Sequence, residues 1–184
     1  MTTLLIGLII FIGIHLLPTL PELRQKYIDK LGELPYKGIF AVISIAGFAL
    51  IIMGKADAPF ISIWQPPQFL SHLTKLLMLP AFILLVAAYI PSNIKRRVRH
   101  PMLAGVKLWA LGHLLINGDA ASILLFGGFL AYAVIDMIRA NKRSEWVKPE
   151  PKPAYMTFVV IGVGVIAYGA VAMHHMQLFG VPLF

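Results

Sequence analysis

The chain has 184 residues, of which 59% are hydrophobic and only 13% are charged, and its mean hydropathy is +0.81. Soluble domains are roughly 45–50% apolar and about 25% charged, so this composition excludes an ordinary water-soluble globule and also a disordered chain. The net charge is +8. In a membrane protein such an excess sets topology and contacts anionic lipid, and we expect no nucleic-acid partner. The absence of cysteine excludes disulfides, iron–sulfur clusters and covalent haem attachment.

Six apolar segments approach the length of about 20 residues that a membrane-spanning helix needs. In chain order they are residues 3–20, 38–53, 73–90, 101–117, 120–138 and 155–173. Pro80 predicts a kink in the third. The first lacks a basic leading region and a cleavage site, so we expect it to be retained rather than removed as a signal peptide. The sequence therefore predicts an all-α, polytopic membrane protein with six transmembrane helices in one bundle, forming a single domain over residues 1–184.

Positive residues are concentrated in alternate connections between these spans. Thirteen of the 16 Lys and Arg lie between spans one and two, three and four, and five and six, whereas the other connections hold only Lys55 and Lys75. Short cytoplasmic loops are enriched in basic residues. We therefore expect these three loops in the cytoplasm and both termini outside an inner (plasma) membrane. Lys107, inside the fourth span, is expected to snorkel to the cytoplasmic interface.

Two further connections have distinctive compositions. Residues 148–153 alternate proline with charged residues, which predicts a stiff, solvated linker. Residues 60–69 contain Trp64 and two prolines, and we expect this loop to lie at the outer lipid interface, where tryptophan is favoured.

Two histidines lie deep in different predicted spans. At about 1.5 Å per residue, His15 is roughly 18 Å from the outer end of its helix and His113 roughly 18 Å from the inner end of its own. In a hydrocarbon core about 30 Å thick, they then lie within about 6 Å of the same depth. Two imidazoles can hold one metal, and without cysteine or a carboxylate pair at that depth the best-fitting centre is a haem iron. Alternatively, each histidine only hydrogen-bonds a neighbouring helix.

The helix face around His113 is small, aromatic and polar. Gly105, Trp109 and Asn117 recur on it at helical spacing, so it differs from a face turned toward lipid. The glycine admits either a flat cofactor or another helix. Asn117 is a candidate partner of an axial histidine. The stretch 117–119 also predicts a tight outer turn in which Asp119 caps the next helix.

Charged residues at the span ends provide further candidates. Arg99 and His100 precede Pro101 at the start of the fourth helix, and arginines beside a helix N-terminus suit an anionic group, either haem propionates or lipid phosphates. Asp136 is expected to pair with Arg139 at the inner end of the fifth span. Weaker candidate ligands toward the outer side are His72, His174 and His175.

The segment from Arg99 to Asp119 resembles the NnrU family. The resemblance rests on Arg99-His100-Pro101-Met102, Gly105, Leu108-Trp109-Ala110, His113-Leu114-Leu115 and Asn117-Gly118-Asp119, and residues 7–18 resemble the first helix of that family. The family is related to the plant and cyanobacterial 15-cis-zeta-carotene isomerase. The resemblance implies an integral membrane protein with haem b, whose iron ligands match His15 and His113, and an association with denitrification and nitric oxide metabolism.

Three functional hypotheses follow from the resemblance. The first is redox-gated isomerisation of a polyene, in which ferrous iron loses one histidine and exposes a coordination site. The second is a non-catalytic accessory subunit of nitrogen-oxide respiration. The third is a membrane methyltransferase, suggested by a second resemblance, because isoprenylcysteine and phospholipid methyltransferases also carry Arg-His-Pro and a later glycine at a helix start. In those enzymes a downstream acidic pair and an arginine complete the methyl-donor site, and for these roles this sequence offers only Asp136 and Arg139. Expected partners are the lipid bilayer and a quinone, nitric oxide, a polyene lipid or a respiratory protein.

Overall fold

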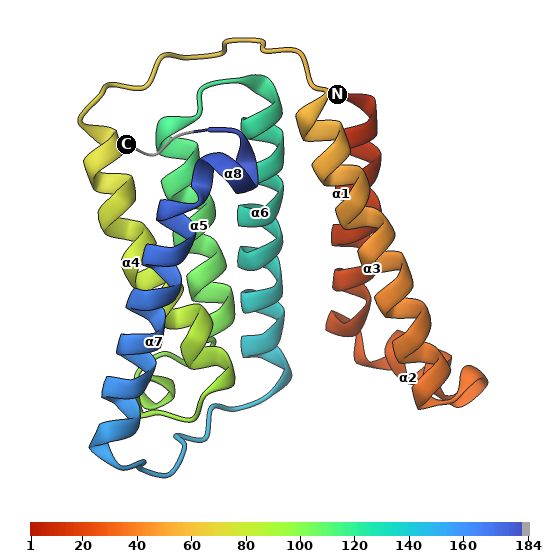
Figure 1. Ribbon diagram of the computed structural model, residues 1–184. Coiled ribbons are helices and arrows are strands. Elements are labelled where there is room, and N and C mark those ends of the chain that lie inside the picture. Colours follow the sequence, from red (N-terminus) through yellow and green to blue (C-terminus); the bar gives the residue numbers. More distant parts are fainter. Residues whose placement is uncertain (182–184) are drawn as a thin grey trace.

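The structure, a computed structural model, describes residues 1–181 and consists of helices joined by connecting segments, of which residues 57–69 are the longest (Figure 1). In chain order the elements are α1 Thr2–Leu16, η1 Leu17–Thr19, α2 Pro21–Leu31, α3 Glu33–Ala56, α4 Leu70–Tyr89, η2 Asn93–Arg96, α5 Pro101–Ile116, α6 Ala120–Arg143, α7 Ala154–Met173 and α8 His175–Phe179. Over residues 1–181 there is no β-strand, only an isolated bridge between Ser62 and Asp119. The predicted all-α class is confirmed.

Six of these helices correspond one by one to the predicted spans. Five are long and apolar enough to cross a membrane: α1 with η1, α3, α4, α6 and α7. The sixth, α5, is a shorter apolar helix of 16 residues, which corresponds to about 24 Å of rise. It packs between α4 and α6. The chain is therefore a multi-pass membrane protein, with α5 packed between two of the longer helices.

The helix ends differ from the predicted ones where polar turns extend an apolar helix. The second span begins at Glu33 rather than at residue 38, and the fifth continues to Arg143 rather than ending at 138. Pro80 lies inside α4, which continues on both sides of it. Sequence analysis missed α2, a polar helix without buried residues that begins at Pro21 and is separated from α3 by Gly32 at φ 85°. It also missed the short α8.

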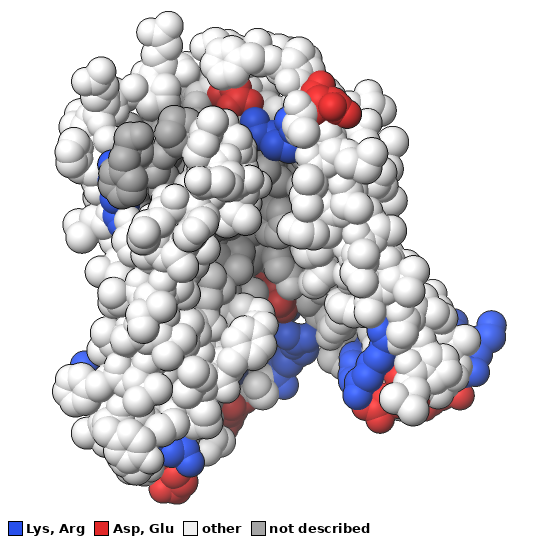
Figure 2. Space-filling view, viewed as in Figure 1, with Lys and Arg blue, Asp and Glu red and all other residues white. Residues whose placement is uncertain are grey.

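Successive helices run in opposite directions, so alternate connections lie at opposite ends of the molecule (Figure 1). One end, called the basic end below, carries α2, η2 and the connection between α6 and α7. The opposite end carries the N-terminus, residues 57–69, residues 117–119 and α8. On the face seen in Figure 2, charged side chains gather at these two ends, and the band between them is largely free of charge. This distribution is typical of a protein embedded in a bilayer.

The helices form two groups that meet at α6. One group is the hairpin of α1 and α3, and the other contains α4 to α7 (Figure 1). Leu4 and Leu8 of α1, Ile51 of α3 and Ala121 of α6 form a shared buried cluster near the opposite end. Farther toward the basic end, Figure 2 shows a hollow between the hairpin and the other group.

Candidate functional site

The two deep histidines make the same local hydrogen bond. Nδ1 of His15 lies 2.7 Å from the carbonyl oxygen of Phe11, and Nδ1 of His113 lies 2.8 Å from that of Trp109. A carbonyl oxygen only accepts, so each Nδ1 carries the proton and donates it. In the neutral ring Nε2 then holds the free lone pair, which is the arrangement that metal-ligating histidines adopt.

His15 lies in an aromatic environment contributed by three helices. Its ring stacks on Phe11 of the same helix with 4.1 Å between centroids. Phe40 of α3 and Tyr132 of α6 approach it edge-on at 5.1 and 6.1 Å. The side chain is half-buried. His15 therefore belongs to the junction of the hairpin with α6 and does not lie on an outer surface of α1.

His113 has a similar aromatic environment nearer the start of α6. Its ring stacks on Phe126 of α6 at 4.5 Å, and Trp109 of α5 lies 5.2 Å away. Trp109 in turn contacts Phe126 edge-on at 5.1 Å. The predicted proximity of Trp109 to His113 is therefore present, and both residues face α6.

Phe129 of α6 contacts the aromatic residues next to both histidines. Its ring is 5.5 Å from Phe11, which stacks on His15, and 5.5 Å from Trp109, which adjoins His113. Within the described part of the chain, no ring contact joins the two histidines directly. They contact α6 six positions apart, at Tyr132 and Phe126, which is a rise of about 9 Å along that helix.

Two other predicted residues near His113 contact the protein itself. Gly105 is buried against α4, where an added Cβ would lie 2.9 Å from the carbonyl oxygen of Ala81. It therefore serves the helix contact, which was one of the two alternatives for it. Asn117 Nδ2 donates to the main-chain oxygen of His113 at 2.8 Å, not to its ring. The main-chain nitrogen of Asn117 donates to the same oxygen at 3.0 Å, so Asn117 bonds the end of α5 twice.

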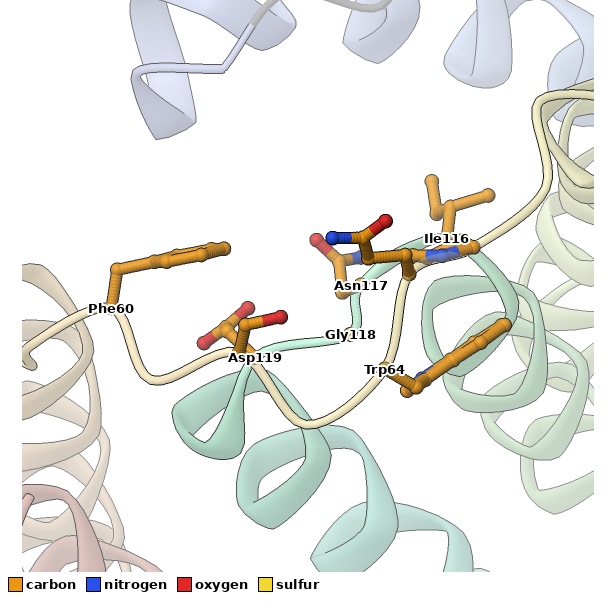
Figure 3. Close-up of a pocket in the computed structure, with 9 residues that line it drawn as sticks. Phe60, Trp64, Ile116, Asn117, Gly118 and Asp119 are labelled. Carbon is orange, nitrogen blue, oxygen red and sulfur yellow. The ribbon is translucent and has the colours of Figure 1, made fainter.

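Residues 117–119 form the predicted tight connection between α5 and α6, but Asn117 and Asp119 are extended, and the stretch pairs with the outer loop instead of forming a hydrogen-bonded turn. Gly118 oxygen accepts from the main-chain nitrogens of Ile63 at 2.8 Å and Trp64 at 3.2 Å. The predicted N-cap is confirmed, since the Asp119 carboxylate accepts from the Ser122 nitrogen at 3.0 Å. Figure 3 shows the cavity of about 340 Å³ that this pairing borders.

The arginine and histidine before Pro101 contact the end of α6. Arg99 Nη2 donates to the main-chain oxygens of Ala140, at 3.5 Å, and Ser144. His100 Nε2 lies 3.0 Å from Oδ1 of Asn141. A cation at the C-terminus of a helix is stabilising because the last carbonyls there lack helical partners. Both residues therefore join the start of α5 to the end of α6.

The predicted pairing of Asp136 with Arg139 is wrong. Asp136 pairs instead with Arg143, with 3.3 Å between Oδ1 and Nη2. Arg139 Nη1 donates to the hydroxyl of Thr19 in η1 at 2.7 Å. The buried Thr19 supplies Arg139 with a hydrogen-bond acceptor from a distant part of the chain. Asp136 therefore pairs with Arg143 and not with Arg139.

The remaining polar candidates are three further histidines and Lys107, which contacts a methionine sulfur. Lys107 Nζ lies 3.0 Å from the sulfur of Met137, and His72 is exposed on α4. Nδ1 of His174 donates to Ala170 oxygen at 2.9 Å and that of His175 to Val181 oxygen at 2.6 Å, near the end of α7. Among residues 1–181, no three His, Asp or Glu side chains gather to hold a metal ion.

Comparison with protein families connects this geometry to a known group. A protein-family model with the description NnrU protein matches residues 3–183, nearly the whole chain. The chain belongs to the NnrU family. The two NnrU-like segments recognised in the sequence, residues 7–18 and 99–119, both lie within the matched residues. Comparisons of this NnrU-family chain with curated proteins and with solved structures gave no match.

Sequence analysis of this NnrU-family chain missed the aromatic residues of α6 that adjoin both histidines. Phe126, Phe129 and Tyr132 recur every third residue along α6. Such spacing places side chains on neighbouring faces of a helix, and it was the signal available in the sequence. In this chain, these three rings make α6 the element between His15 and His113.

Proposed function

We propose that this NnrU-family chain is an integral membrane haem b protein in which His15 and His113 supply the iron ligands. The observation that carries the proposal is the matched hydrogen bond of the two imidazoles, which presents Nε2 of each as the free ligand atom. A third buried ligand is not required, because haem iron needs only axial ligands from the protein.

The surroundings of the histidines fit a flat, apolar cofactor in their chemistry. Phe11, Phe40 and Tyr132 surround one imidazole, and Trp109 and Phe126 adjoin the other. Aromatic walls exclude water from a metal centre and thereby raise its sensitivity to nearby charge. The half-buried Phe129 contacts both aromatic groups, so its side chain determines how much room there is beside each histidine.

A bound haem b would supply a one-electron redox centre, and we propose polyene isomerisation or nitric oxide metabolism as its use. The chain's own contribution is to bind and orient. The Phe11 and Trp109 carbonyls fix the imidazole tautomers, and the aromatic rings keep the site dry. A catalyst and an accessory subunit would share this haem, so the cofactor is the first thing to test.

The optical spectrum of protein purified from haem-replete cells tests the proposal. We expect a Soret band that sharpens with distinct α and β bands on reduction, as for iron held by two histidines. His15→Ala and His113→Ala should each lose this spectrum and most of the bound iron. His174→Ala is the matched control, because His174 makes the same bond to the carbonyl four residues earlier but is exposed.

The outcomes separate the cofactor from the activity. Wild-type protein without haem, or a His15→Ala/His113→Ala double variant with an unchanged spectrum, would exclude this site. If haem is bound, chromatography of a cis-polyene incubated with reduced protein distinguishes an isomerase from an accessory subunit. Calorimetric binding of a methyl donor by haem-free protein would instead favour the methyltransferase alternative.

A further inference from the structure

A cavity at the basic end is lined mainly by positive side chains. It has a volume of about 400 Å³ and lies between η2 and the connection that follows α6. Its lining residues are Asn93, Arg96, Arg97, Lys148, Pro151 and Lys152. Four of these six are cations, and none is an acid. Several like charges around one cavity produce a field that favours an anion.

Hydrogen bonds hold this cavity in shape. Asn93 Nδ2 donates to the Lys152 oxygen at 2.7 Å, and its Oδ1 accepts from the Lys152 nitrogen at 2.9 Å. The Asn93 nitrogen also donates to the Thr157 hydroxyl of α7 at 3.3 Å. The prolines of residues 148–153 stiffen the connection. The two cationic segments are therefore fixed against each other.

Neighbouring cations at this end already have protein acceptors. Lys95 Nζ donates to the Ala88 oxygen at the end of α4 at 2.8 Å, and Arg99 donates to carbonyls at the end of α6. By contrast, across the described chain, no ion pair involves any of the four lining cations. Arg96 Nε is buried without a hydrogen-bond partner. These four charges thus remain available to a ligand.

We propose that this cavity binds a phosphate group at the membrane surface. Arginine offers a planar fork that fits phosphate oxygens, and lysine adds point charge. The cavity adjoins the ends of α4 and α7, where phospholipid headgroups lie against a membrane protein, and basic pockets between spans bind such headgroups. The phosphate belongs either to an anionic phospholipid or to a soluble phosphate compound. This site is independent of the haem proposed above.

Native mass spectrometry of the full chain in detergent tests the lipid source. Wild-type protein should retain phosphatidylglycerol in preference to phosphatidylcholine of the same acyl chains. Lys148→Gln/Lys152→Gln should weaken phosphatidylglycerol binding about 25-fold, or roughly five-fold for each cation removed at the surface. The matched control is Lys26→Gln/Lys30→Gln, which removes two exposed lysines from α2 at the same end and should change binding little.

Calorimetry with inorganic phosphate in lipid-free detergent tests the soluble source. Phosphate binding that the Lys148→Gln/Lys152→Gln variant loses would support the site with a soluble ligand, and lipid binding alone would identify the headgroup. Equal losses in the two double variants, or neither lipid preference nor phosphate binding in the wild type, would overturn the proposal.

Asn93→Ala provides a second test that keeps every charge. It removes the two bonds that hold Lys152 against η2, so we expect weaker binding of phosphatidylglycerol at unchanged net charge. If Asn93→Ala binds phosphatidylglycerol as tightly as the wild type, the lipid is attracted by the overall positive charge of the basic end. That result would overturn the proposal of a specific cavity.

Discussion

Lys55 at the end of α3 and Asp119 at the start of α6 form an ion pair, with 3.2 Å between Nζ and Oδ1. The same carboxylate oxygen accepts from the Ser122 nitrogen at 3.0 Å. One buried side chain therefore caps α6 and also fastens it to the α1–α3 hairpin. At the basic end, the bond from Arg139 to Thr19 joins the same two groups. The hairpin and η1 are thus tied to α6 near both ends of that helix.

We expect Asp119→Ala to lower the free energy of unfolding by about 1–2 kcal/mol. The loss of an N-cap costs about 0.5–2 kcal/mol, and a partly exposed ion pair adds little. Denaturant unfolding in detergent, followed by circular dichroism, measures the change. Asp57→Ala is the control, since Asp57 is an exposed carboxylate one residue past α3. Equal losses in both variants would contradict the capping role.

The same carboxylate makes stability depend on pH. Burial raises the pKa of Asp119, but the hydrogen bonds from Ser122 and Lys55 outweigh burial, so its pKa lies below the ordinary value. Because the pKa is lower in the folded state, the contribution is present above the unfolded pKa of about 4 and is lost as pH falls through the folded pKa. Thermal unfolding from pH 7 downward should show this loss in the wild type and not in Asp119→Asn. If the two proteins lose thermal stability in parallel as the pH falls, Asp119 does not cause the pH dependence.

The membrane helices were predictable because hydropathy alone requires them to be buried in lipid. Their polar extensions were not. The first turn of α3 is held by an exposed ion pair between Glu33 and Lys37, at 2.7 Å, which leaves no apolar signal. Likewise α2 is polar and lies against α3 without burying a side chain. This helix depends on Pro21 at its start and on packing against α3. The spacing of apolar residues in the sequence reveals neither.

The candidate site was predictable in part. Counting residues along two spans identified His15 and His113, because an ionisable side chain inside a membrane is rare and costly. The bond from Arg139 to Thr19 spans 120 positions in the chain. Local helical spacing cannot anticipate such a contact and therefore gave Arg139 the wrong partner. Similarly, Gly105 is explained only once α4 is seen to pack on it.

Gly54 tests the close approach of α1 and α3. A methyl group at this position would collide with the main chain of Leu4, so the two helices would have to separate. We expect Gly54→Ala to cost about 1–3 kcal/mol, as for overpacking in a core. Gly169→Ala in α7 is the control, because open space surrounds a Cβ there. Comparable thermal stability of the two variants in detergent would show that the α1–α3 contact has room for a methyl group at this position.

Thr74 tests the contact between α4 and α5 beside His113. Its hydroxyl donates to the Gly112 oxygen at 2.8 Å from a buried position. Thr74→Val preserves the shape and removes the donor, and interhelical bonds of this kind in membranes contribute about 0.6 kcal/mol on average and at most about 1.7. We expect a loss within this range in denaturant unfolding, because the helical bond to the same oxygen remains. Thr3→Val, at an exposed position of α1, should leave stability unchanged, and a Thr74→Val protein as stable as this control would show that the bond contributes nothing to the α4–α5 contact.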